Sequence, residues 1–435
     1  MPEAVLAYKK ACLSPLLSSY ETEAMTKIAG RDATAGLDPR TLRGTGTGVE
    51  RGANGMSIPQ AKQMRRAYGF DEVAIVPGAA TVNPAMTEVA FRLDHLEFPL
   101  PILAAAMDGV VDPAFAASLS ELGGLAVLNL EGVQTRYEDP AAVLAEIAAA
   151  SPNEATSLLQ RAYAAPIQPG LIGQRVEDIK RAGGVCAVSA TPANTKKFAP
   201  LAKEAGVDVF VVQSTVTTAR HISYSEKGLV MSELVEQMRP VPVIVGNAVT
   251  FDACKELMET GVSGVLVGVG PGAACTSREV LGIGVPQVTA TMDCAAARDQ
   301  FYREKGRYVP IITDGGIRSG GDLCKAFATG ADAVMLGSIL AACEEAPGGG
   351  HHWGMATPNA DLPRGVRVTV GVNTTLRQTL FGPTSHTDGT ENLIGALRTA
   401  MGMCGARTIR DFQQAEMVIA PSIKTEGKQI QMAQR

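Results

Sequence analysis

Residues 309–338, VPIITDGGIRSGGDLCKAFATGADAVMLGS, contain two apolar runs joined by an amphipathic stretch. The runs VPIITDGG and ADAVMLGS are nearly continuous in apolar residues, as expected for parallel strands that are covered on both faces. The stretch between them, SGGDLCKAFATG, has helical period. The segment therefore predicts a strand, a helix and a second strand that lies parallel to the first.

The same unit repeats along the chain. Most runs end in Gly, Ser, Asn or Asp, and most lead into a segment of helical period. Eight such units predict a closed (β/α)8 barrel, the TIM barrel of the α/β class, and not an open doubly wound sheet. The six further runs are PILAAAMD (101–108), GLAVLNL (124–130), GVCAVSA (184–190), VDVFVVQS (207–214), VPVIVGN (241–247) and SGVLVGVG (263–270).

Two segments do not show this alternation of apolar runs and helical segments. Residues 1–56 include the glycine-rich, aperiodic GTGTGVERGANGM and predict a poorly ordered N-terminal extension, which leaves residues 57–435 as the barrel domain. Residues 131–183 have helical character without strand signals. They predict a helical connection, too short and too poor in strands for an inserted mixed domain.

Composition narrows the class of protein. The 435 residues carry a net charge of −5, and there is no run of five like charges, which argues against nucleic acid and anionic membranes as partners. No apolar stretch reaches the roughly 18 residues of a membrane helix, and the first residues lack the apolar core of a signal peptide. The eight cysteines are scattered and form no CxxC pair. A soluble, cytoplasmic protein with reduced thiols is expected.

Two glycine loops predict a phosphate site. In a barrel, the loops at the carboxyl ends of the strands build the active site, and phosphate commonly binds after strands seven and eight. Here those loops are TDGGIRSGG (313–321) and LGSILA (336–341), and each starts a helix. Asp314 lies at the mouth of its strand, where a carboxylate can bind a ribose diol. The N–H groups that can hold phosphate belong to Gly315, Gly316, Gly337 and Ser338.

Cys275 lies in GVGPGAACTSREVLG (268–282), the loop after the sixth strand, on the same face as the phosphate loops. A helix over Ser277–Leu281 would begin beside it and favour the thiolate. For any single cysteine the ordinary alternative is a small buried apolar residue. The glycines at 268, 270 and 272 would also let backbone carbonyls turn toward a monovalent cation.

These residues resemble the inosine 5'-monophosphate dehydrogenase and guanosine 5'-monophosphate reductase family. The similarity extends from Tyr68 to about Gly427, and it is carried by GVGPGAACTSREVLGIGVPQVTA, IITDGGIRSGGDLCKAFATGADAVMLGSILA, VIVGNAVT, AAMDGV and YGFDEVAIVPG. In that family the barrel binds a purine nucleotide, a cysteine attacks purine C2, and a hydride moves between C2 and a nicotinamide.

The resemblance implies a role for each matching position. The catalytic residues would be Cys275, Ser277 and Arg364. The nucleotide would contact Met107, Ala273, Asp314, Gly316, Gly337, Ser338, His352, Gly354 and Met355. NAD would lie on Gln213, Ser214, Asn247, Gly268 and Gly270. A potassium ion would be bound by Gly270, Gly272 and Cys275, completed by Glu426, Gly427 and Lys428 of a neighbouring subunit in a homotetramer or octamer.

Several positions depart from the family pattern. The paired CBS modules of many dehydrogenases are missing. Ala105 and Ala273 replace serines that contact the nucleotide, and Gln213 replaces an aspartate that binds the ribose of the cofactor. The mobile flap is short, with Arg364 where an acid or amide is usual. His352 replaces a tyrosine that touches phosphate, although adjacent histidines are more often polar loop residues.

The predicted reaction is the oxidation of IMP to XMP with NAD. Because the usual water-activating pair is absent, we expect Ser277 to relay the proton while Arg364 places the water. Two alternatives stay open at this point. One is reduction of GMP to IMP with NADPH, although Arg364 cannot donate the proton that a glutamate would. The other is a purine-nucleotide-binding barrel without turnover.

Overall fold

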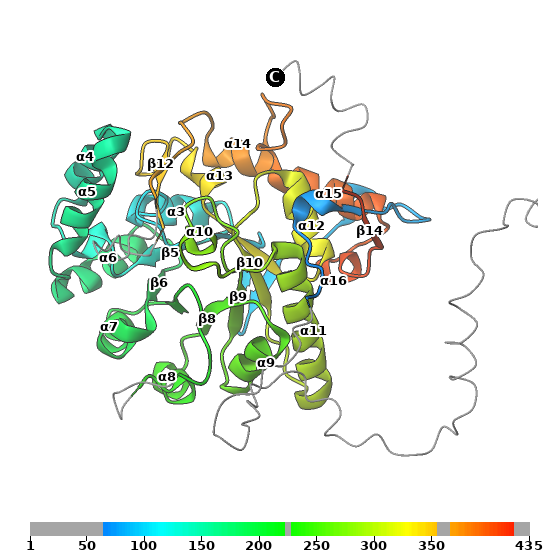
Figure 1. Cartoon of the computed structure of the whole chain (residues 1–435), viewed down its shortest axis with the longest axis horizontal. Coiled ribbons are helices and arrows are strands. Elements are labelled where there is room, and N and C mark those ends of the chain that lie inside the picture. Colours follow the sequence, from blue (N-terminus) through cyan, green and yellow to red (C-terminus); the bar gives the residue numbers. More distant parts are fainter. Residues whose placement is uncertain (1–63, 222–227, 355–365, 422–435) are drawn as a thin grey trace, which may run out of the picture. The chain divides into compact units, whose positions relative to one another are not determined.

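Eight parallel strands close into a barrel in the computed structural model of the chain (Figure 1). The structure describes residues 64–221, 228–354 and 366–421. The chain divides into two units, residues 1–65 and 66–435, and the barrel belongs to the second. Each strand pairs in parallel with the next one in the sequence, and the pairing of Val334 with Ile102 closes the ring.

The predicted TIM barrel is confirmed, because each of the eight predicted runs coincides with one barrel strand, to within one residue at Ala248. All eight strands are buried along nearly their whole length. In barrel order they are β4 (Ile102–Ala104), β5 (Leu125–Asn129), β6 (Ala187–Ala190), β7 (Val209–Gln213), β8 (Val243–Ala248), β9 (Gly264–Val267), β10 (Ile311–Asp314) and β11 (Ala333–Leu336).

Helices connect the strands and cover the outside of the barrel. Several begin at side chains that accept a backbone N–H, such as Asp112, Thr250 and Ser319, which satisfies a donor that the first turn leaves free. The connecting helices are α3 (Pro113–Glu121), α6 (Pro169–Arg181), α7 (Pro192–Glu204), α8 (Met231–Met238), α9 (Phe251–Glu259), α11 (Gln287–Lys305) and α12 (Gly320–Ala328).

A hairpin that the sequence did not reveal packs into the barrel interior. Its strands are β2 (Phe91–Leu93) and β3 (Leu96–Phe98). Phe91, Leu93 and Phe98 form one apolar cluster with inward-facing residues of the barrel strands. Leu93 lies close to Gly264, the first residue of β9, so the hairpin covers the amino end of the barrel. The carboxyl end, where barrel enzymes place their active sites, is left open.

The stretch from Glu131 to Gly183 is helical and contains no strand, and every residue of it is described. Beside α6 it holds η3 (Val133–Thr135), α4 (Pro140–Ala149) and α5 (Pro152–Ala164). Figure 1 shows α4 and α5 side by side, outside the barrel. Both helices contribute to a separate apolar cluster that includes the buried Trp353.

The remaining elements flank the barrel. β1 pairs with β14 and β12 with β13, both antiparallel, and α15 packs against α12. None of the helices in the described residues is long and apolar enough to span a bilayer. The elements are η1 (Phe70–Glu72), β1 (Val73–Ile75), η2 (Pro84–Met86), α10 (Ser277–Leu281), α13 (Ser338–Ala341), β12 (His351–His352), β13 (Val368–Thr369), α14 (Leu376–Phe381), α15 (Leu393–Met403), α16 (Ile409–Phe412) and β14 (Met417–Ile419).

Candidate active site

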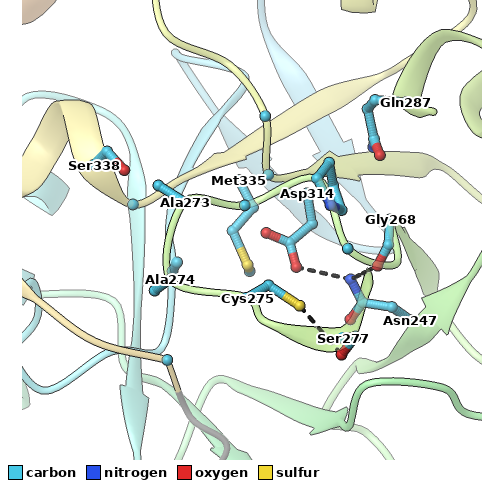
Figure 2. Close-up of a pocket in the computed structure, with 18 of the residues that line it drawn as sticks. Asn247, Gly268, Ala273, Ala274, Cys275, Ser277, Gln287, Asp314, Met335 and Ser338 are labelled. Atoms are coloured by element: carbon cyan, nitrogen blue, oxygen red, sulfur yellow. Dashed lines mark hydrogen bonds between the residues drawn. The ribbon is translucent and has the colours of Figure 1, made fainter. Parts of the chain in front are cut away.

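The carboxyl ends of the strands surround a cavity of about 960 Å³ (Figure 2). Every predicted site residue that the structure describes lines it, although these residues come from loops more than 200 positions apart in the sequence. They are Met107, Gln213, Ser214, Asn247, Gly268, Gly270, Gly272, Ala273, Cys275, Ser277, Asp314, Gly316, Gly337, Ser338, His352 and Gly354. The predicted residues Met355, Arg364, Glu426, Gly427 and Lys428 lie outside the described residues.

The loop between β9 and α10 presents Cys275 to this cavity. The thiol donates a hydrogen bond to Ser277 Oγ over 3.3 Å (Figure 2), and the Cys275 N–H donates to Gly272 O at 3.0 Å. Gly270 has φ of +84°, and a Cβ there would lie 2.8 Å from Arg278 Nε. Glycine is therefore needed at this position for the turn and for the passage of the Arg278 side chain.

Cys275 differs from the other cysteines in its surroundings. Among the seven cysteines that the structure describes, none forms a disulfide, and five are buried. Burial raises the pKa of Cys186, Cys324 and Cys343 to about 12, which keeps those thiols protonated and inert. Cys275 and Cys404 are partly exposed, and of the seven only Cys275 lines the cavity.

Asp314 occupies the end of β10 and accepts hydrogen bonds from two side-chain amides, one on β7 and one on β8, which are not adjacent to β10. Asn247 Nδ2 donates to Asp314 Oδ2 at 2.8 Å and to Gly268 O at 2.8 Å (Figure 2), while Gln213 Nε2 donates to the same carboxylate oxygen at 3.0 Å. Burial raises the pKa of Asp314 to about 6, although both amides act to lower it. The carboxyl group is therefore mainly ionised at neutral pH.

The glycine loops after β10 and β11 form another part of the cavity wall. Within the described residues, the N–H groups of Gly316, Gly337 and Ser338 donate to no protein atom. Such free donors at loop and helix starts are suited to an anion. Met107 lies across Gly337, because a Cβ on this glycine would be 3.0 Å from the Met107 sulfur.

His352 lies beside these donors and is not a solvent-exposed loop residue. It is 1% exposed, lies on β12, and its Nε2 is 2.9 Å from Ser338 Oγ. Burial lowers the pKa of His352 to about 4, with the neighbouring charge of His351 acting in the same direction. The ring is neutral at pH 7, and its buried Nδ1 has no hydrogen-bond partner in the part of the chain that the structure describes.

Two further cavity residues were missed in the sequence. Gln287, the first residue of α11, donates to Val267 O at 2.6 Å, and its buried Oε1 has no partner within residues 64–221, 228–354 and 366–421. Arg318 lies in the loop after β10 and binds Asp71 at 2.6 Å and Asp322 at 3.0 Å. Both are in the stretches GVPQ and TDGGIR that carry the resemblance, and Arg318 is the only basic residue between Asp314 and α12.

Comparison with known proteins identifies a family. The model described as "IMP dehydrogenase / GMP reductase domain" matches residues 67–428. An uncharacterized oxidoreductase of Mycobacterium leprae is 38% identical over 374 residues, which cover 84% of this chain and all of that protein. An inosine-5'-monophosphate dehydrogenase of Cryptosporidium parvum is 33% identical over 295 residues, 66% of this chain and 71% of that one.

A crystal structure supports the same relationship. An IMP dehydrogenase/GMP reductase-like protein of Corynebacterium glutamicum superposes with a TM-score of 0.79 at 33% identity. The superposition covers 84% of this chain and 97% of that protein. The resemblance found in the sequence is therefore confirmed over the whole barrel.

Proposed function

Because the chain belongs to the IMP dehydrogenase / GMP reductase family, we propose that this oxidoreductase is an NAD-dependent IMP dehydrogenase. It would convert IMP, NAD+ and water to XMP, NADH and a proton. One observation carries the proposal: the cavity that holds Cys275 also holds the Asp314 carboxylate and the free N–H groups of Gly316, Gly337 and Ser338. A nucleophile, an acceptor for a ribose diol and a phosphate cradle are thus in one place.

Cys275 acts as the nucleophile in this proposal. Its thiolate adds to C2 of IMP, so that a carbon–sulfur bond forms. Bound NAD+ supplies the hydride acceptor, and loss of hydride from C2 leaves a thioimidate that is attached to the enzyme. Water then adds to C2, the carbon–sulfur bond breaks, and XMP leaves with the thiol regenerated.

Ser277 is the candidate for the proton transfer in the hydrolytic step. Its Oγ lies 3.3 Å from the Cys275 sulfur, and the residue is 3% exposed. Arg364, which we propose places the water, lies outside the described residues. We predict that Ser277→Ala slows hydrolysis by about 100-fold and changes hydride transfer far less, as measured by single-turnover kinetics. An unchanged hydrolysis rate would contradict this role.

We propose that the nicotinamide would contact Gln213, Ser214, Asn247 and the loop glycines Gly268 and Gly270. These residues line the same cavity as Cys275. Gly272 has open space where a Cβ would lie, so the loop leaves room there. The proposed potassium ion would lie on the carbonyls of Gly270, Gly272 and Cys275. We also propose, from the family resemblance, a cytoplasmic homotetramer or octamer.

The second candidate is a reduction in place of an oxidation: GMP and NADPH would give IMP and ammonia. The short segment before Arg364 and the missing CBS modules favour it. Both reactions need Cys275 and the same nucleotide contacts. A barrel that binds nucleotide without turnover would not need the thiol.

Trapping the covalent intermediate tests the proposal. The enzyme is mixed with IMP and NAD+, quenched with acid, and digested for mass spectrometry. We expect a purine nucleotide adduct on the peptide that contains Cys275. Cys404→Ala serves as the control, because it removes the other partly exposed thiol among the described cysteines and should keep the adduct. An adduct that forms only with GMP and NADPH would favour the reductase, and no adduct in either mixture would contradict both.

A further inference from the structure

Gln213 reaches across the base of the cavity. It ends β7, whereas Asp314 ends β10, and two barrel strands lie between them. Its Nε2 nevertheless donates to Asp314 Oδ2 at 3.0 Å and to Asn247 Oδ1 at 3.3 Å, and lies 4.0 Å from the Met335 sulfur. The resemblance assigns Gln213 to the cofactor, but its contacts in this structure are with the carboxylate that the nucleotide would use.

We infer that Gln213 is a positioning residue for the nucleotide, which holds the Asp314 carboxylate with one oxygen, Oδ1, turned to the ribose. The inference rests on the proposed function, in which Asp314 binds the ribose hydroxyls. An aspartate, which the resemblance would place at position 213, has no N–H to donate. With glutamine at position 213, the Asp314 carboxylate gains a hydrogen-bond donor that an aspartate there could not supply.

The orientation of the Gln213 amide is fixed by its neighbours. Two oxygen atoms, from Asp314 and Asn247, face its Nε2. Rotation of the amide by half a turn would direct its own oxygen at both of them, with no proton between. In the observed orientation Oε1 is buried and has no hydrogen-bond partner among the described residues. An unsatisfied buried oxygen is unfavourable for stability, which indicates that the donation to Asp314 is what this arrangement serves.

Only one of the two Asp314 carboxylate oxygens accepts hydrogen bonds from the described residues. Oδ2 accepts from both Gln213 and Asn247. Among the described residues, no donor bonds to the other oxygen, and in Figure 2 that oxygen points away from Asn247. Since Gln213 and Asn247 fix Oδ2 from two strands, the plane of the carboxylate is set before a ligand binds, and preorganisation of this kind favours affinity.

Binding of IMP and of 2'-deoxy-IMP to the full chain tests the inference, measured by calorimetry without NAD+. 2'-Deoxy-IMP lacks one ribose hydroxyl and therefore reports on Asp314 directly. The readout is the dissociation constant of 2'-deoxy-IMP divided by that of IMP. We expect Gln213→Met, which keeps the volume and loses the donor, to lower this ratio about tenfold. Gln213→Glu, which places a carboxylate against Asp314, is expected to lower it at least as much.

Two further variants complete the design. Gln287→Met removes another buried cavity amide, whose Nε2 bonds to Val267 O and not to Asp314, and should leave the ratio unchanged. Asp314→Asn should lower the ratio, with no further loss when it is combined with Gln213→Met. A wild-type ratio in both Gln213 variants would overturn the inference and leave the proposed function intact. Failure of the wild-type protein to bind IMP would overturn the proposed function itself.

Discussion

At the scale of single residues, the environment of each cysteine decides its chemistry. Five of the seven described cysteines are buried, in agreement with the ordinary role of a free cysteine as a small apolar residue. Cys275 is held instead on a loop of small residues at the mouth of the barrel, next to Ser277. Its sequence neighbours GPGAA indicate this loop, whereas no local pattern identifies the five buried cysteines as buried.

His352 shows what local sequence does not reveal. As one of two adjacent histidines it has the pattern of a polar loop, yet it is 1% exposed and bonded to Ser338. Its burial depends on the packing of β12 against the loop after β11, which brings residues from two separate segments together. Only tertiary structure supplies that contact.

The stability of the protein should depend on the titration of His352. The folded pKa of about 4 is below the value of roughly 6.5 for an unfolded chain. The stability that comes from the neutral ring is therefore present above pH 6.5 and is lost as the pH falls toward 4. Between pH 7 and pH 5 the loss amounts to about 2 kcal/mol.

We predict that His352→Gln loses less stability than the wild type over this range, as measured by calorimetric unfolding at both pH values. His95→Gln, at an exposed histidine, should behave as the wild type does. The carboxyl groups whose pKa values are raised by burial, those of Asp108, Asp112 and Asp314, change stability in the opposite direction, but equally in all three proteins. Equal losses in His352→Gln and the wild type would contradict the prediction.

At the scale of elements, the loop between β9 and α10 depends on a left-handed glycine. Gly270 has φ of +84°, and a Cβ there would lie 2.7 Å from Arg278 Cγ. We predict that Gly270→Ala lowers the free energy of unfolding by about 1–3 kcal/mol, because of backbone strain and this contact. Gly272→Ala is the matched control in the same loop, since its Cβ would meet nothing within 4 Å.

Urea unfolding followed by circular dichroism measures both variants. The strained loop also positions Cys275. Gly270→Ala should therefore slow the alkylation of this thiol, or alter how strongly bound IMP protects the thiol from alkylation. If Gly270→Ala were as stable as Gly272→Ala, the described loop geometry would be wrong.

A second element, the helix pair α4 and α5, is tied to the cavity wall by a buried chain of hydrogen bonds. Trp353 Nε1 donates to Tyr163 Oη at 2.7 Å, and Tyr163 donates to Asp108 Oδ2, which also accepts the Val133 N–H at 3.1 Å. Trp353 directly follows His352, and Asp108 directly follows Met107. The helix pair therefore supports two residues of the candidate nucleotide site.

We predict that Tyr163→Phe destabilises the protein by about 1–3 kcal/mol, because it leaves the Trp353 N–H without an acceptor in a buried site. Tyr137→Phe is the control in the same region: its hydroxyl donates only to Ala162 O, and the residue is partly exposed to solvent. It should cost less than about 1 kcal/mol. Thermal unfolding of the two variants side by side gives the comparison, and equal destabilisation would contradict the role of the buried chain.

At the scale of the whole molecule, the barrel could be predicted because its strands are buried on both faces and leave nearly continuous apolar runs. Other elements lack such a pattern. The strands β2 and β3 have three residues each, too few to establish a period. The helix α11 buries Gln287, Thr289, Thr291 and Arg298 beside its apolar residues, so no apolar stripe marks its inner face.

Most of the candidate site could be predicted once the barrel was predicted. Sequence motifs indicated the loops, and the closed barrel brings their residues to one cavity. The hydrogen bond from Gln213 to Asp314 could not be predicted, since the two residues are 101 positions apart and on strands that are not neighbours. Contacts across the barrel depend on strand register and side-chain length together.

The nicotinamide absorbance of the purified protein tests the central claim most directly. Potassium is present, and IMP with NAD+ is compared with GMP and NADPH. The proposed dehydrogenase predicts that NADH appears with IMP, and that this activity vanishes in Cys275→Ala while Cys404→Ala retains it. Consumption of NADPH with GMP, without NADH formation from IMP, would contradict the dehydrogenase, and silence in both mixtures would contradict catalysis at this site.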